Sequence, residues 1–252
     1  KYFVYDRTTN KTSLLFGSKI QEPKFSPDGS KVAFVFQRNL YVKDLGANSI
    51  EQITSDGSEH IINGLSDWVY EEEFGFVRAF DWNADGSALA FMQFDETLVP
   101  TYSMDVIGDN LYPFPYTFKY PKAGETNSVV GLYLYSLADK NVTSILLGDE
   151  KPYYIPRIKF SPNKNKLMVQ TINRHQNHLQ LWSYDIQQRT AQVILEEREN
   201  TYVDVHDNLK FLKDESFLWT SERDGYNHLY HYKADGTLKK QLTQGNWEVT
   251  RF

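Results

Sequence analysis

The sequence predicts an all-β fold, a β-propeller whose blades are four-stranded antiparallel sheets. Two observations favour this class. A unit of four short strands with polar turns recurs along the 252 residues, and Tyr, Phe and Trp make up 15% of the chain. Four strands per repeated unit are typical of propellers, and aromatic side chains suit strands. One blade cannot bury both of its faces alone, so neighbouring blades must stack.

The first complete unit begins at residue 24. Its strands are expected at residues 24–25, 31–36, 39–45 and 51–54. The turn Asp28-Gly29 joins the first two strands, and this dipeptide supplies the positive φ angles that a tight hairpin requires. Residues 2–16 have the pattern of the outer half of such a unit.

The same order of strands and turns returns three times. The inner hairpins of the later units lie at residues 80–91, 159–169 and 210–219, and two outer strands complete each unit. About four whole blades and two partial ones therefore fill residues 1–252 as one partial propeller domain. Strand-like sequence at residues 1–5 and 248–252 leads us to expect a piece of a longer protein.

The connection between Ile53 and Phe80 is longer than the repeat requires. It carries three consecutive carboxylates, Glu71, Glu72 and Glu73, between two aromatic clusters. Adjacent like charges repel and resist burial, so the run needs solvent or a cation. One hypothesis is a solvated acidic turn. The other is a cation-binding prong, where two carboxylates converge on an ammonium group with three donors. No helix of useful length is expected in the chain.

A second long connection, from about Glu96 to Gly131, lies inside the second unit. We call residues 97–124 the arm. It is rich in aromatic residues, namely Tyr102, Tyr112, Phe114, Tyr116, Phe118 and Tyr120. Aromatic residues alternate with others at its end, which indicates a strand. Such an arm either buries its rings against a partner chain, the hypothesis we favour, or folds back over its own blade.

Composition excludes several classes of protein. The net charge of −6 and pI of about 5.6 argue against a nucleic-acid partner. The absence of cysteine excludes disulfides and a cysteine nucleophile. No apolar run is long enough to span a bilayer, and no Gly-x-Ser-x-Gly marks a nucleophile elbow. Because His228 and His231 face opposite sides of a predicted strand, they cannot share an ion. We expect no metal and no cofactor.

Residues 67–74 (DWVYEEEF) resemble the double-glutamate motif of dipeptidyl peptidase IV, in the prolyl oligopeptidase family of serine peptidases. Further segments resemble that family in the right order over most of the chain. They are residues 94–100 (FDETLVP), 120–124 (YPKAG) and 221–230 (SERDGYNHLY). The first motif is specific, whereas the blade pattern alone is shared with TolB-like propellers.

The resemblance implies an eight-bladed propeller that caps an α/β-hydrolase domain bearing Ser, Asp and His. Such an enzyme releases Xaa-Pro or Xaa-Ala dipeptides from peptide N-termini. The last two acids of the run, Glu72 and Glu73, would bind the free α-ammonium of the substrate, with Glu71, Tyr70 and Trp68 in support. The arm would help to form a homodimer through its aromatic residues Tyr112, Phe114, Tyr116, Phe118 and Tyr120.

Several expectations follow for the chain itself. The hydrolase domain lies outside it, so the chain holds no catalytic residue and should be inactive alone. Its partners would be peptides with a free N-terminus, that hydrolase domain and a second copy. An assisting arginine would precede Lys1, and an aromatic-arginine motif expected near residues 203–208 is not recognisable. The lack of cysteine and a similarity to bacterial members favour a periplasmic or cell-surface location.

Two alternatives stay open at this point. The chain could be part of a stand-alone TolB-like or WD-type propeller, a non-catalytic scaffold for protein–protein interaction. It could also belong to a prolyl tripeptidyl peptidase of the same family.

Overall fold

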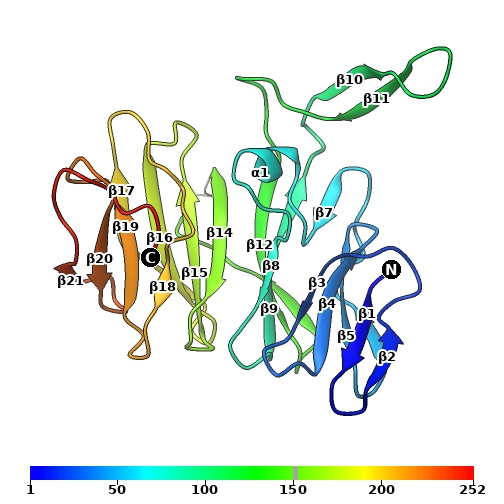
Figure 1. Ribbon diagram of the computed structural model, residues 1–252, viewed down its shortest axis with the longest axis horizontal. Coiled ribbons are helices and arrows are strands. Elements are labelled where there is room, and N and C mark those ends of the chain that lie inside the picture. The colour runs from blue at the N-terminus through cyan, green and yellow to red at the C-terminus, as the bar shows by residue number, and fades with distance from the viewer. Residues whose placement is uncertain (150–152) are drawn as a thin grey trace. The chain divides into compact units, whose positions relative to one another are not determined.

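The computed structural model describes residues 1–149 and 153–252, and nearly all of its regular structure is β-strand (Figure 1). Its contacts divide the chain into two compact units. The first comprises residues 1–80 and 91–143, and the second comprises residues 81–90 and 144–252. In the described part of the chain, no helix has the length and apolarity that crossing a membrane requires.

The first unit begins with a two-stranded pair and a four-stranded sheet, as the sequence predicts. The pair is β1 (Phe3–Asp6) with β2 (Lys11–Leu14). The sheet has the order β3 (Gln21–Phe25), β4 (Lys31–Phe36), β5 (Asn39–Asp44) and β6 (Ser49–Gln52). Phe34 is fully buried in a cluster with Leu15, Ile20 and Val32. These apolar side chains form the core beside the sheet.

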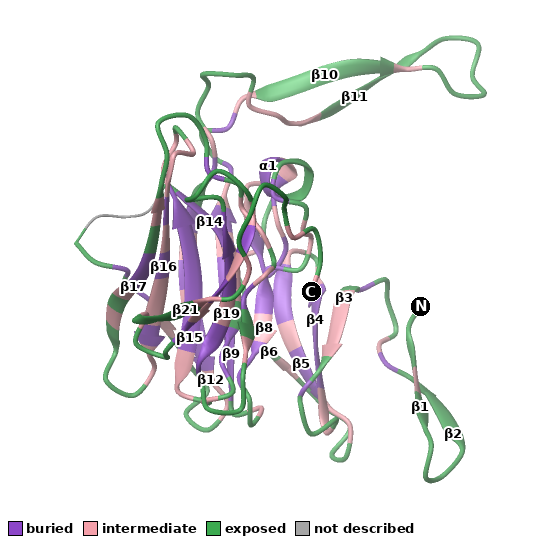
Figure 2. Ribbon diagram, turned by 60° about the vertical axis from the view of Figure 1, so that its left-hand side comes forward, coloured by how far each residue is buried: buried purple, intermediate pink, exposed green. Residues whose placement is uncertain are grey.

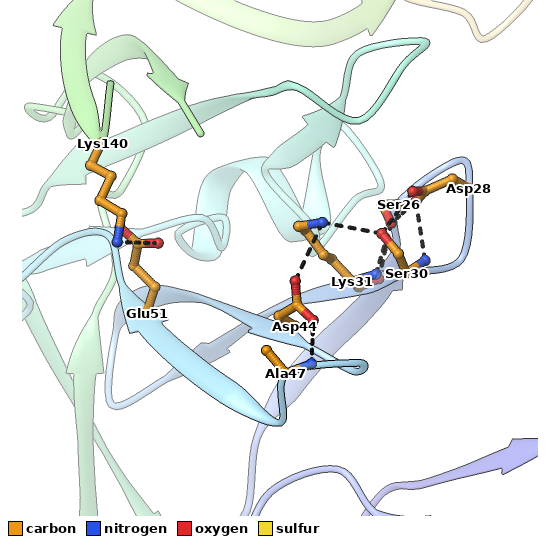
Figure 3. A network of polar contacts seen from close by, with 8 residues as sticks. All are labelled: Ser26, Asp28, Ser30, Lys31, Asp44, Ala47, Glu51 and Lys140. Carbon is orange, nitrogen blue, oxygen red and sulfur yellow. Dashed lines mark hydrogen bonds and ion pairs between the residues drawn. The ribbon is translucent and has the colours of Figure 1, made fainter. Parts of the chain in front are cut away.

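The Asp28-Gly29 turn joins β3 to β4 through a network of short hydrogen bonds (Figure 3). Ser26 Oγ donates to Asp28 Oδ1 at 2.6 Å, and Ser30 Oγ donates to Oδ2 at 2.7 Å. Gly29 has a φ of 71°, the left-handed conformation that glycine adopts without strain. The bonds from Ser26 and Ser30 hold the pKa of the Asp28 carboxyl well below its usual range.

The second sheet contains one strand that the sequence did not predict. Its order is β13 (Asn141–Ser144), β12 (Val129–Ser136), β9 (Ala88–Asp95) and β7 (Ile61–Asn63), and β8 (Phe80–Trp82) also pairs with β9. The predicted first strand of this unit is β8. The additional strand β7 comes from the long connection before it, and pairs Ile62 with Phe94. Part of the extra length after Ile53 therefore extends the sheet.

Glu51 on β6 links the first sheet to the second. Tyr135 Oη donates to Glu51 Oε1 at 2.6 Å, and Lys140 Nζ lies 3.6 Å from Oε2 (Figure 3). Burial, followed by the bond to the carboxylate, raises the pKa of Tyr135. A buried phenol and an exposed ammonium thus hold one carboxylate between two neighbouring sheets.

The arm forms a β-hairpin of β10 (Thr101–Val106) and β11 (Phe114–Lys119), so the strand predicted near its end is confirmed. Nearly all of its residues are exposed (Figure 2). The exposed fraction reaches 88% for Ile107 and 90% for Leu111 near the tip. The hairpin therefore does not fold back over its own blade along its length.

The second unit contains two four-stranded antiparallel sheets. The first has the order β14 (Tyr154–Phe160), β15 (Lys166–Ile172), β16 (His178–Asp185) and β17 (Thr190–Arg198). The other has the order β18 (Lys210–Phe211), β19 (Phe217–Ser221), β20 (His228–Tyr232) and β21 (Leu238–Gln241). Both match predicted units. Trp219 is fully buried and donates from Nε1 to Glu197 Oε1 at 3.2 Å.

The strand expected at residues 248–252 is wrong, because none of these residues lies in a strand. Val249 N donates to Asn227 O at 2.7 Å, and Asn227 Nδ2 donates to Val249 O at 2.8 Å. Both bonds go to the single residue that precedes β20. A strand needs hydrogen bonds to several successive residues of a neighbouring strand, and these two bonds involve one residue only.

Candidate functional site

The acidic run lies at the end of a short helix, α1 (Trp68–Glu72), a five-residue element that the sequence pattern did not predict. Asp67 is its N-cap and accepts from Tyr70 N through Oδ1 at 3.0 Å. At the other end, Glu73 N donates to Val69 O at 2.8 Å. An Asp N-cap followed by an acidic first turn is a helix-start signal. Five residues are too few for helical periodicity to reveal it.

One side of α1 is anchored in the core. Val69 and Tyr70 are buried, and the Tyr70 ring lies 4.8 Å from the ring of Phe94 on β9. Phe74 and Phe76 contact the same tyrosine at 5.0 Å and 5.8 Å between ring centroids. The aromatic clusters on both sides of the run thus pack around one ring and fix the helix on its sheet.

The three glutamates lie on the exposed side. Glu71, Glu72 and Glu73 are all exposed, and no cation among the described residues forms an ion pair with any of them. Glu72 ends the helix and Glu73 is its C-cap, and successive residues on a helix point in directions roughly 100° apart, so the two side chains leave the backbone in different directions. A solvated run and a cation-binding pair both remain compatible with this exposure.

The predicted supporting residues have separate places. Tyr70 belongs to the core beneath the helix and is 1% exposed. Trp68 instead meets Tyr120 edge to face, with ring centroids 4.4 Å apart. Tyr70 therefore holds the helix to the sheet, and the contact between Trp68 and Tyr120 holds it to the arm.

A buried acidic pair lies behind the helix and was not singled out from the sequence. Asp67 and Glu96 are 5% and 4% exposed. Asp67 Oδ2 accepts from Ser128 Oγ at 2.5 Å, and Glu96 Oε2 lies 3.3 Å from Arg38 Nη1. Burial raises the pKa of both carboxyls, and the charge of Asp67 adds to the effect on Glu96. The clue in the sequence is Asp67 itself, the first residue of the glutamate motif.

Asp67→Asn is expected to stabilise the protein increasingly as the pH rises. The folded pKa of Asp67 lies above the unfolded value of about 3.9. Its contribution to stability is complete below that pH and is lost as the pH rises through the folded pKa. Asn retains an acceptor for Tyr70 N and offers a donor to Ser128 Oγ. Urea unfolding from pH 4 upwards should show the variant gaining stability over the wild type and then levelling off.

Asp28→Asn is the matched control, because its pKa is shifted in the opposite direction. A carboxyl with a lowered folded pKa stabilises the protein above its unfolded pKa and loses that effect as the pH falls. The wild type should therefore gain over this variant as the pH rises through about 4. A stability difference for Asp67→Asn that shrinks with rising pH would contradict the raised pKa.

The aromatic residues of the arm separate into a tip and a base. Tyr112, Phe114 and Tyr116 are exposed, whereas Phe118 and Tyr120 are half-buried. At the base, the Tyr120 ring lies 5.5 Å from that of Tyr102. The tip thus presents apolar rings to solvent, and the base packs against α1 through Tyr120.

In the second unit, residues 203–206 and Asn208 help to line a cavity of about 270 Å³. The cavity has an acidic rim of Glu199, Asp204 and Glu222, and burial followed by the neighbouring carboxylates raises the pKa of Glu222. No arginine occurs in residues 203–208. The guanidinium that lines the cavity is that of Arg223, which lies 2.6 Å from Glu197 Oε1. The motif at residues 221–230 supplies part of this lining, and the aromatic-arginine motif expected near residues 203–208 is absent from it.

Within the cavity lining, His206 accepts from Asn208 N through Nδ1 at 3.2 Å, and its Nε2 lies 2.9 Å from Thr220 O. Burial lowers its pKa. On β20, His228 is buried and His231 half-buried, as their alternation along the strand predicts. No group of three or more potential metal ligands occurs in residues 1–149 and 153–252.

The comparisons with known proteins agree with the sequence motifs. The family described as "Dipeptidyl peptidase IV (DPP IV) N-terminal region" matches residues 1–252. The crystal structure of Porphyromonas gingivalis dipeptidyl peptidase 4 is 41% identical with a TM-score of 0.94, over 99% of this chain and 36% of that chain. A probable dipeptidyl peptidase 4 of Aspergillus flavus is 31% identical over 99% of this chain and 35% of its own length.

A probable dipeptidyl-aminopeptidase B of Pyrenophora teres f. teres is 29% identical over 99% of this chain and 31% of its own length. The chain therefore spans about a third of the length of these relatives. The predicted fold class, a β-propeller of four-stranded antiparallel blades, is confirmed by the sheets and by the similarity to the bacterial structure. Because the family match runs from the first residue to the last, this chain belongs to the dipeptidyl peptidase IV N-terminal region family.

Proposed function

We propose that this chain is the propeller domain of a serine-type dipeptidyl peptidase, and that it binds and admits peptides with a free N-terminus. Glu72 and Glu73 bind the α-ammonium of the peptide. The observation that carries the proposal is a run of exposed carboxylates, without a protein cation among the described residues, on a helix fixed to the core. Membership of the family supports the same role.

The chemistry of an ammonium group suits this arrangement. It offers three donors and accepts nothing, so carboxylates complement it fully. Two opposite unit charges about 4 Å apart near a surface attract by about 4 kcal/mol before desolvation costs. The pKa of an α-amino group is about 7.7–8, so much of it is charged at neutral pH.

Holding the ammonium also sets the position of cleavage. Two extended residues span roughly 7 Å, so the second peptide bond is the one presented at a fixed distance from Glu72 and Glu73. The nucleophile belongs to a C-terminal α/β-hydrolase domain with Ser, Asp and His. The product is then a dipeptide that ends in Pro or Ala, and mass spectrometry of the product distinguishes it from a tripeptide.

Blocking the amino terminus tests the proposal. With the full-length protein, N-acetylation of an Xaa-Pro peptide is expected to lower kcat/KM by about 100-fold or more, because two carboxylates lose their partner on binding. N-methylation is the control, since it adds bulk and keeps the positive charge. Equal rates for the free and acetylated peptides would mean that the acidic run is a solvated edge and does not bind the ammonium.

A further inference from the structure

Two contacts join the segment between β11 and β12 to the helix that carries the glutamates. The ring of Trp68, the first residue of α1, meets Tyr120 with 4.4 Å between centroids and 72° between planes. Asp67, the N-cap, accepts the hydroxyl of Ser128 at 2.5 Å. Tyr120 directly follows β11 and Ser128 directly precedes β12. Both partners of the helix N-terminus therefore lie on the segment that returns from the arm to the sheet.

The base of the arm is itself firmly held. Tyr120 N donates to Pro100 O at 2.9 Å, and Lys119 Nζ donates to Val99 O at 2.8 Å. The Tyr102 ring contacts the Tyr120 ring at a tilt of 51°, and Lys122 Nζ lies 5.5 Å from the centre of the Tyr102 ring. The outgoing and returning segments are thus tied together where Tyr120 meets the helix.

A helix this short depends on tertiary contacts for its orientation. It has five residues, and helices far longer than this are marginal in water without tertiary packing. Tyr70 fixes its inner side to the sheet. At its N-terminal end, Asp67 and Trp68 contact Ser128 and Tyr120, which lie on the segment between β11 and β12. Figure 1 shows α1 at the same end of the sheet as the arm.

We propose that Ser128 and Tyr120 are positioning residues for recognition of the peptide amino terminus. They orient α1 through Asp67 and Trp68, and α1 in turn orients Glu72 and Glu73. This inference rests on the proposed function of those two glutamates. Affinity for an ammonium group then depends on the base of the arm, although neither Ser128 nor Tyr120 contacts the peptide.

The test uses the full-length protein and the ratio of kcat/KM for a free Xaa-Pro peptide to that for its N-acetylated form. Ser128→Ala and Tyr120→Leu are each expected to lower this ratio by roughly 10- to 100-fold, because small displacements of a positioning group cost that much. Ser128→Thr, which keeps the hydroxyl, and Tyr120→Phe, which keeps the ring, should retain it. A loss of folded protein lowers both rates equally and leaves the ratio unchanged.

The double variant Glu72→Ala with Glu73→Ala separates the two proposals. If it lowers the ratio while Ser128→Ala and Tyr120→Leu do not, the positioning role is wrong and the binding role stands. If the double variant keeps the wild-type ratio, both proposals are wrong. The positioning role is supported only when Ser128→Ala, Tyr120→Leu and the double variant all lower the ratio. Ser128→Thr and Tyr120→Phe must also retain the wild-type ratio.

Discussion

Glu72→Ala combined with Glu73→Ala is expected to lower kcat/KM for a free Xaa-Pro peptide by about 100- to 10,000-fold in the full-length protein. A hydrogen bond to a charged group contributes about 1.5–3 kcal/mol, and two such bonds to the ammonium are removed. The rate for the N-acetylated peptide should change little, because that peptide has no ammonium to lose. The thermal midpoint should hold, since both side chains are exposed and have no ion-pair partner in the described part of the chain.

Two single variants sharpen this experiment. Glu59 is an exposed glutamate in the same unit, so Glu59→Ala controls for the loss of one negative charge. Its kcat/KM should stay within a few-fold of the wild type, because Glu59 is not one of the two carboxylates proposed to bind the ammonium, and solvent screens exposed charges that make no direct contact. Glu71→Ala should cost less than either Glu72→Ala or Glu73→Ala. Full activity of the double variant on the free peptide would disprove the assignment of these two glutamates.

We propose that the arm forms a dimer contact of the full-length protein, so removing its tip is expected to give monomers. The register pairs Ser103 with Thr117, so an Asn-Gly turn can join these two residues and close a shorter hairpin. The deletion removes the most exposed apolar side chains, among them Ile107, Leu111 and Tyr112. Rings and aliphatic groups presented to solvent in this way are typical of a protein interface. Light scattering measures the mass.

This design keeps the base of the arm. Tyr102, Phe118 and Tyr120 remain, so α1 retains its contact with Tyr120. Leu111→Arg should weaken the dimer in the same direction, whereas Leu146→Arg, at a 73% exposed leucine outside the arm, should leave the mass unchanged. A tip-deleted protein that keeps the mass of a dimer would show that the arm does not hold the two copies together.

The strand repeat was predictable because its causes are local. The apolar, β-branched and aromatic residues of β4 and β5, and the Asp28-Gly29 turn between β3 and β4, are features of residues close in sequence. The same holds for β11, whose aromatic residues alternate with others. By contrast, β7 has three residues and α1 has five, and neither is long enough to display a period. Their positions depend on packing against β9.

The sequence alone determined the class of fold, the order of the blades, the place of the arm and the acidic run, since turn chemistry and side-chain period are properties of neighbouring residues. Tertiary structure alone decided that the acidic run sits at the end of a helix, and that this helix is fastened to the arm. The bond between Asp67 and Ser128 joins residues 61 positions apart. No local pattern encodes such a contact, because it exists only once the sheet brings both segments to the same place.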